Sequence, residues 1–380
     1  MIKLIKNVVK LASFILLLGG TGSFVSAQEV HNSFQGTWHG EVVEIVDEEM
    51  REIMGTDTNQ LFQTVRAEVL DGPKGGEVVT IENDFLQLDV GDKFYFNYNV
   101  YIDGTESYGV ISIDRRSQLF LLIGLFVLAI VAFGGWQGVR SITALLGSFF
   151  AIFYILMPGI LNGTNPLLIS VLVASGILFA AIFFTHGFNR ESAVAYGGTM
   201  IAVSLTSLFA IYAVTITDLS GFASEAATYV NLNTRGALDF TALLIGAMII
   251  GVLGVLDDIA VTQAAVVTEL FSSNRSMSRR EVYMRAIRVG REHVGALVNT
   301  LVLAYAGASL PLLLHFYMST DSLSMAANTE LLATEIVRTV VGSVGLILAV
   351  PIVTLLAVFY LKDYEPKHGH SHSHGHGHHH

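Results

Sequence analysis

The stretch GVLGVLDDIAVTQAAVVTEL, residues 251–270, places two adjacent carboxylates, Asp257 and Asp258, inside an apolar, glycine-spaced run. Ionisable side chains at membrane depth are costly, and they usually serve an ion or proton pathway or pair with a partner. Neighbouring carboxylates can raise each other's pKa or bind a cation through their oxygens. Two interpretations therefore stay open. Either the acids form an ion or proton site, or a membrane helix ends at Asp257 and leaves both acids to water and cytoplasmic arginines.

A helix that continues past Asp257 carries Asp258, Thr262 and Glu269 on one face, whereas Asp257 points roughly 100° away around the helix axis. The start of the next apolar run, GREHVGALVNT, supplies polar side chains that could meet this face. The candidate ion or proton pathway consists of Asp257, Asp258, Thr262, Gln263, Glu269, His293 and Asn299, with Arg288 and Arg291 as further partners of the acids.

A second set of charges lies near the other end of the apolar runs. Glu335 and Arg338, in TEIVRTVVGSVG, are three residues apart and can form an ion pair on one helix. Asp239 begins its own apolar run at the same level and can join that pair. A structural ion pair or a gate would both use these residue types.

The end of the chain, HGHSHSHGHGHHH, contains eight histidines in a glycine- and serine-rich setting. Alternate imidazoles suit zinc, nickel or copper, so the tail is a candidate divalent-metal site or an expression tag. The candidate ligands are His368, His370, His372, His374 and His376.

The composition is that of an integral membrane protein: 52% of the 380 residues are hydrophobic, 14% are charged, and the mean hydropathy is +0.58. An ordinary soluble domain carries about 25% charged residues. A membrane helix needs roughly 20 apolar residues. Seven such stretches are expected near residues 118–137, 141–161, 166–185, 192–215, 237–257, 294–316 and 336–360, and an N-terminal helix would make eight.

Acidic residues concentrate before these spans. Residues 28–115 hold 18 Asp and Glu against 5 Lys and Arg, and their Val-, Ile-, Tyr- and Phe-rich segments are separated by turn signals such as DGPKGG and IDGTES. The expected fold is therefore an α-helical integral membrane bundle with a small N-terminal all-β domain, barrel or OB-like. Residues 1–27 have the basic, apolar and small-residue order of a signal peptide, or form an anchor helix.

Arginines fall on alternate loops of one side, at Arg140, at Arg190 and densely between residues 271 and 293. The positive-inside rule assigns this side to the cytoplasm. It predicts a cell-membrane protein with residues 28–115 outside, a helical domain over residues 116–361, and a cytoplasmic tail over residues 362–380.

Three stretches, GVLGVLDDIAVTQAAVVTEL, GREHVGALVNTLVLAYAGASLPLLL and TEIVRTVVGSVGLILAVPIVTLLA, resemble the YibE/F family of bacterial membrane proteins, and QTVRAEVLDGPKGGEVVTIEND fits its N-terminal part. The resemblance covers nearly the whole chain and implies a multi-pass, permease-like protein without an established substrate. The order of an acidic span, an arginine-rich segment and the GREHVGALVNT entry also resembles, over a shorter stretch, the later helices of SecD/SecF and RND-type transporters.

Several functions are not expected. The chain has no GxxxxGK[ST] loop for a nucleotide, and no GxSxG or HExxH motif, so an enzyme is not expected. It has no basic stripe for nucleic acid. The main hypothesis is a permease-like secondary transporter coupled to a proton or ion through Asp257 and Asp258. The alternative is a scaffold or sensor without transport, whose partner binds the external β domain or the arginine-rich segment.

Overall fold

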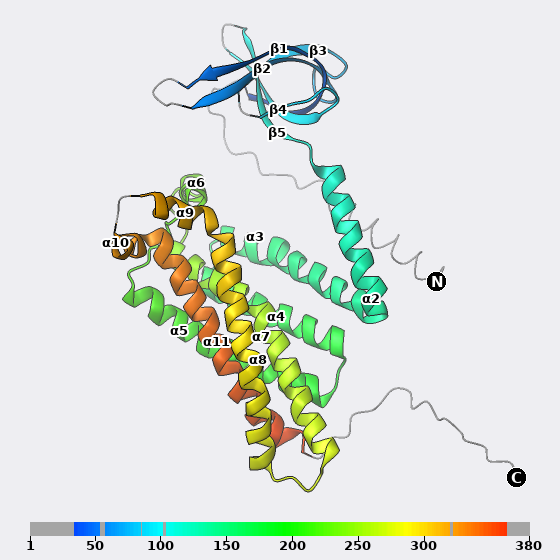
Figure 1. The fold of residues 1–380 in the computed structure, drawn as a ribbon, viewed down its shortest axis with the longest axis vertical. Helices are drawn as coiled ribbons and strands as arrows, with labels where there is room; N and C mark the ends of the chain where they lie inside the picture. Colours follow the sequence, from blue (N-terminus) through cyan, green and yellow to red (C-terminus); the bar gives the residue numbers. More distant parts are fainter. Residues whose placement is uncertain (1–33, 54–57, 85, 102–103, 320–321, 363–380) are drawn as a thin grey trace, which may run out of the picture. The chain divides into compact units, whose positions relative to one another are not determined.

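The computed structural model describes residues 34–53, 58–84, 86–101, 104–319 and 322–362, drawn in colour in Figure 1. The expected signal or anchor segment, residues 1–27, and the candidate metal ligands of the tail lie outside the described residues. The chain divides into two compact units, Met1–Leu125 and Phe126–His380.

The first unit contains one antiparallel five-stranded sheet in the order β3-β2-β1-β4-β5. The strands are β1 (Phe34–Glu52), β2 (Asn59–Val69), β3 (Val78–Asn83), β4 (Lys93–Val100) and β5 (Glu106–Ile113). The long β1 pairs with both β2 and β4 and has register shifts that bend it. The sheet therefore curves into a half-barrel in which the two edge strands, β3 and β5, contact each other.

Strict alternation of apolar residues builds the interior of this half-barrel. Every second residue of β3 is buried, and β2 and β4 bury alternate residues in the same way. Phe94, Phe96, Ile81, Val65 and Leu88 form its core. The expected all-β domain is thus present.

The helices are α2 (Arg116–Ala151), the π-helical turn η1 (Ile152–Leu156), α3 (Met157–Leu161), α4 (Pro166–His186), α5 (Arg190–Ile216), α6 (Glu225–Asn233), α7 (Phe240–Ser273), α8 (Arg279–Ala308), α9 (Leu310–Met318), α10 (Leu323–Asn328) and α11 (Glu330–Tyr360). Local sequence fixes many of their starts. Asn165, Asn189, Asp239 and Ser278 each cap a helix by accepting a hydrogen bond from a backbone N–H of the first turn.

Five of the described helical segments are long and apolar enough to cross a membrane, and six if the bent pair α8 and α9 counts as one span. The first of the five joins α2, η1 and α3 into one 46-residue stretch. Gly135 interrupts α2 with φ 55° and ψ −131°, a conformation that favours glycine. A Cβ on Gly138 would lie 2.4 Å from the carbonyl oxygen of Ile130, so the residues on either side of Gly135 fold back against each other.

Helix α7 occupies the centre of the second unit, where it packs against α4, α5, α8 and α11. The sequence predicts a span that ends at residue 257, but the helix continues without a break to Ser273. The helix itself therefore does not end at Asp257, and the end of its membrane-crossing part at this residue stays a prediction. The extension persists because Ala260, Ala264 and Val267 are buried in a second hydrophobic core that α7 shares with α8 and α11.

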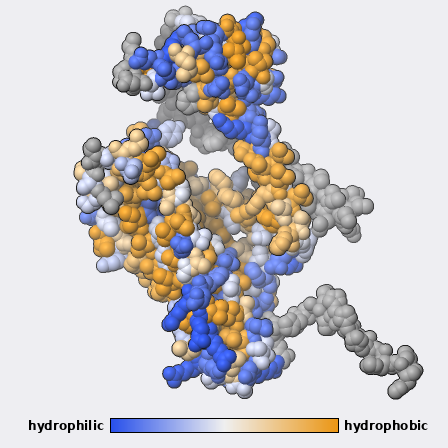
Figure 2. Space-filling view, in the orientation of Figure 1, coloured by the Kyte–Doolittle hydropathy of each residue, from blue (hydrophilic) through white to orange (hydrophobic). Residues whose placement is uncertain are grey.

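Helix α8 begins at Arg279, within the segment expected to be a cytoplasmic connection, and it runs straight into the predicted span at residue 294. The α8–α9 pair bends by 64° at Ser309, and Pro311, which has no backbone N–H to donate, lies in the first turn of α9. Figure 2 shows hydrophobic residues over much of the visible helical surface and hydrophilic residues near the turn between α7 and α8.

Candidate functional site

A cavity of about 590 Å³ lies in the helical unit, and both acids of the DD pair line it. Its other polar side chains come from α2 and from the end of α4. The polar lining residues are Gln137, Ser141, Ser148, Thr185, His186, Asp257 and Asp258. The rest of the lining is apolar, and it includes Leu178, Ile250 and Leu253. The cavity thus combines a low-polarity wall with a cluster of titratable and hydroxyl-bearing groups.

The packing of α7 against its neighbours determines how exposed Asp257 and Asp258 are. Val252, Leu256 and Ile259 are buried on the side of α7 that faces its neighbours. This leaves Asp257 half-buried and Asp258 exposed. Gly254, one turn before Asp258, also lines the cavity, and a Cβ at this glycine would meet no atom within 4 Å. The space beside the acids is therefore open.

The imidazole of His186 is held at the end of α4. The Thr185 hydroxyl and Nδ1 of His186 are 2.7 Å apart. Directly after the helix, the side chain of Asn189 donates a hydrogen bond to the His186 carbonyl at 3.0 Å. These contacts hold the imidazole ring at the part of the cavity wall that α4 forms.

No lysine or arginine lines this cavity, and among the described residues no ion pair joins Asp257 or Asp258 to an arginine. The acids are thus without the cationic partners that the sequence suggested. Within residues 34–362, where the structure describes them, no group of three or more His, Asp or Glu is arranged to hold a metal ion.

The other residues of the candidate pathway are not gathered in the cavity. Gln263 is buried and donates a hydrogen bond to the carbonyl of Ala286 at 2.8 Å, which joins α7 to α8. Glu269 and Asn299 are exposed, and Thr262 is half-buried. His293 has a buried Nε2 without a hydrogen-bond partner among the described residues.

The charges at the other end of the bundle are arranged as two separate features. Arg338 donates a hydrogen bond to Glu335 at 2.6 Å, and Glu335 lines a 240 Å³ cavity between α8, α9 and α11. Asp239 instead caps α7 by accepting a hydrogen bond from the Ala242 N–H. The sequence missed Glu330, whose carboxylate accepts hydrogen bonds from the Ser220 and Gly221 N–H groups and ties the loop after α5 to α11.

The sequence also missed the polar wall opposite the acids. Gln137 and Ser141 lie beside the break in α2, and Thr185 and His186 lie at the end of a predicted span. The only sequence signal for this wall is His186, a histidine at the end of an apolar run. Spacing along the sequence does not show which helix ends lie next to each other in the fold.

The half-barrel has its own charged cluster. The ammonium of Lys74 is 2.5 Å from Oε2 of Glu106, and the hydroxyls of Tyr98 and Tyr108 donate hydrogen bonds to the same carboxylate at 2.9 and 2.8 Å. These three donors lower the pKa of Glu106 to about 2. The carboxylate is therefore a fixed anion that holds the turn containing Lys74 against β4 and β5.

The apolar helices that are long enough to cross a membrane indicate a multi-pass helical membrane protein, which also has a curved all-β domain. Residues 122–363 match the family model described as YibE/F-like protein. The chain belongs to the YibE/F family, as the resemblance of its motifs predicted. Neither the curated proteins nor the solved structures gave a significant match.

Proposed function

We propose that this protein is a permease-like secondary transporter in which Asp257 and Asp258 bind the coupling proton or monovalent cation. The observation that carries the proposal is the cavity of about 590 Å³ that both carboxylates line together with the Thr185–His186 end of α4. Carboxylates inside a membrane bundle are expensive unless they serve an ion pathway or pair with a partner. Here they line open space, to which no lysine or arginine of the described residues contributes.

The proposed topology has seven spans, with the break at Gly135 separating the first two and the α8–α9 pair counted as one. The arginine-rich ends face the cytoplasm and the half-barrel faces the other side, in the membrane of the cell. Asp257 lies 17 residues after Phe240, roughly 26 Å along the helix, against about 30 Å of hydrocarbon. The acids then lie near the cytoplasmic boundary of the hydrocarbon, and the cavity opens to that side.

In this proposal, binding of the proton or cation to Asp257 and Asp258 couples ion movement to transport. Two adjacent ionised carboxylates repel each other, so a bound proton or cation relieves the repulsion and lowers the cost of enclosing the site. His186 lines the same cavity and adds an imidazole that can donate or accept a hydrogen bond there. The Ser141 hydroxyl can donate to a carboxylate, whereas the Ser148 hydroxyl already donates to the Ala144 carbonyl at 3.0 Å and can accept from a hydrated ion.

The test compares the wild type with Asp257→Asn/Asp258→Asn, each shortened after residue 366 to remove the histidines. Thermal stability is measured in detergent from pH 5 to 8, with Na⁺ and K⁺ as the cation probes. A ligand at about 100 times its Kd stabilises a protein by ~2.7 kcal/mol, so a wild-type shift of several degrees is expected. Proton entry into liposomes that contain a pH dye measures the flux.

Two controls separate the cavity from the rest of α7. Glu269→Gln removes a carboxylate on the same helix but outside the cavity, and it should behave as the wild type does. Gly254→Leu fills the space beside the acids and should abolish the shift while both carboxylates remain. Identical pH and cation curves for the wild type and the double variant would overturn the proposal.

A second function, a scaffold or sensor without transport, is favoured by the junction between the half-barrel and α2. His39 of β1 lies with Nδ1 3.0 Å from Asp71, and its Nε2 is 2.9 Å from the Arg116 guanidinium, which also pairs with Asp114. A ligand on the half-barrel could act on the first turn of α2 through these contacts. Partner capture that depends on the half-barrel, without any ion-dependent stability or flux, would favour this function.

A further inference from the structure

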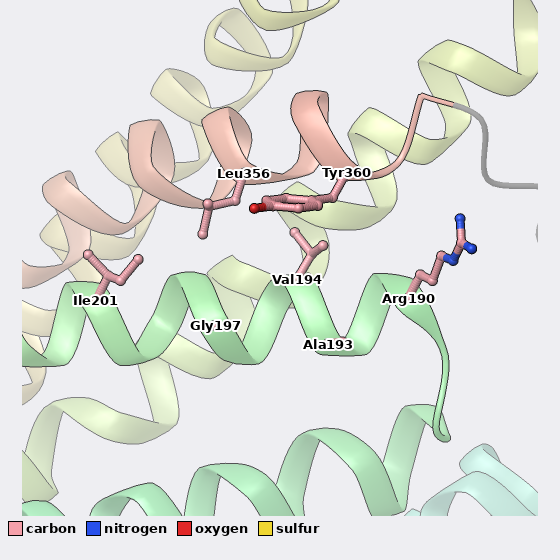
Figure 3. A pocket seen from close by; sticks show the side chains of 7 residues that line it. All are labelled: Arg190, Ala193, Val194, Gly197, Ile201, Leu356 and Tyr360. Carbon is pink, nitrogen blue, oxygen red and sulfur yellow. The ribbon is translucent and has the colours of Figure 1, made fainter.

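A groove of about 530 Å³ runs along the outer surface between α5 and α11, away from the acidic cavity. Apart from Arg190 and the hydroxyl of Tyr360, its walls are apolar. The lining residues are Arg190, Ala193, Val194, Gly197, Ile201, Leu356 and Tyr360. Figure 3 shows Arg190 at the end of the groove where α5 begins and Ile201 towards the other end.

The two helices are antiparallel and closely packed. Gly198 of α5 approaches Val353 of α11, and Gly345 of α11 approaches Thr206 of α5. The start of α5 therefore lies beside the end of α11. The groove exists because the adjacent Gly197 has no side chain and no atom within 4 Å of where its Cβ would lie.

The length of the groove matches one half of a bilayer. Arg190 and Ile201 are 11 residues apart on α5, about 16 Å at the rise of an α-helix, and half of a hydrocarbon core is roughly 15 Å. An acyl chain that enters beside Ile201 would reach the headgroup level at Arg190. The apolar walls suit hydrocarbon.

The end of the groove at Arg190 is positively charged. The Arg190 side chain is exposed and has no ion-pair partner among the described residues. A second cation, Arg279 at the start of α8, lies against the end of α11: its guanidinium stacks over the ring of Phe359 at 5.3 Å, and Phe359 directly precedes Tyr360. Basic side chains at the membrane surface attract anionic lipid headgroups.

We propose that the α5–α11 groove is a binding site for an anionic phospholipid of the leaflet on the arginine-rich side, with one acyl chain against Gly197 and the phosphate at Arg190. This site requires only that the helical unit is embedded in a membrane. The lipid-site proposal therefore does not depend on transport through the acidic cavity. A zwitterionic lipid would fill the same apolar walls but would lose the net charge attraction.

Native mass spectrometry of the full chain in detergent tests the site with dioleoylphosphatidylglycerol and dioleoylphosphatidylcholine as probes. The wild type is expected to bind the anionic lipid more tightly. Arg190→Gln should weaken anionic binding roughly five-fold and leave zwitterionic binding unchanged, since one basic residue near an anionic surface corresponds to about that factor. Glycerol phosphate, a headgroup without chains, should not compete.

Gly197→Leu fills the groove and should remove the bound lipid of either kind. Gly176→Leu is its matched control, because Gly176 is also an open helical glycine but does not line the groove. Equal lipid binding by Gly197→Leu and Gly176→Leu would overturn the proposal, as would an unchanged preference for the anionic lipid in Arg190→Gln. Competition by glycerol phosphate would also overturn it, because the site would then be a free-phosphate site.

Discussion

Adjacent glycines of α5 test how closely α5 and α11 pack. A Cβ at Gly198 would lie 2.7 Å from Cγ2 and 3.1 Å from Cα of Val353, whereas Gly197 has no atom within 4 Å. Packed carbon atoms lie at about 3.5–4.0 Å, so Gly198→Ala must move this contact by about 0.8 Å or more. Because the backbone of α11 is part of the contact, the two helices themselves must separate.

The magnitude follows from comparing Gly198→Ala with Gly197→Ala. Each replaces a helical glycine and gains about 1 kcal/mol of helix propensity, which cancels in the comparison. Overpacking costs typically ~1–3 kcal/mol, and only Gly198→Ala incurs it. Gly198→Ala is therefore expected to be the less stable of the two by about 1–3 kcal/mol, or to melt roughly 2–12 °C lower.

The assay is thermal unfolding of both full-length variants and the wild type in one detergent, followed by the helical circular dichroism signal. Gly197→Ala should melt at or above the wild-type temperature, because its new methyl group enters open space. Equal melting temperatures for the two variants, or a lower one for Gly197→Ala, would refute the close α5–α11 contact.

Three further results are expected. Acidification from pH 4.5 towards 2 should destabilise the half-barrel, because Lys74 and two tyrosine hydroxyls lower the pKa of Glu106 from 4.5 to about 2. The stabilisation by the ionised Glu106 carboxylate is fully present above pH 4.5 and is lost as the carboxylate is protonated. Glu106→Gln should flatten this acid transition in a circular dichroism titration, and an unchanged profile would contradict the assignment. Gln263→Leu should lower stability to chemical denaturation by about 0.6 kcal/mol, the mean for a hydrogen bond between membrane helices, and a loss above about 2 kcal/mol would contradict that role. Phe94→Ala removes a ring that is 0% exposed and should cost about 3–5 kcal/mol, seen as loss of the sheet signal while the helices persist.

Local sequence alone locates several elements closely. The stretches expected at residues 166–185 and 192–215 correspond to α4 and α5, whose bounds differ by two residues or fewer. Apolar runs of bilayer length and capping residues such as Asn165 and Asn189 are local signals, so they need no knowledge of the neighbours. The alternation that identifies β3 is equally local.

The course of α7 beyond Asp257 was not determined by local signals. Its apolar residues after the acids, Ala260, Ala264 and Val267, are compatible with either a bundle helix or a surface segment. In the structure these three residues belong to the core between helices, because α8 and α11 cover them. The helix extends beyond residue 257, the predicted end of the span, because hydropathy measures the fit to lipid, whereas this part of the helix is stabilised by other helices.

The sequence by itself determined that the chain is a membrane protein of the YibE/F family with an acidic β domain, because composition, periodicity and motifs are properties of the chain alone. Only the tertiary structure decided what surrounds Asp257 and Asp258. The break at Gly135 and the packing of α4 against α7 bring Gln137 and His186 to the acids from more than 70 residues away. Contacts between residues that are far apart in the sequence depend on which helix faces pack against each other. The spacing of residues along the sequence does not encode that packing directly.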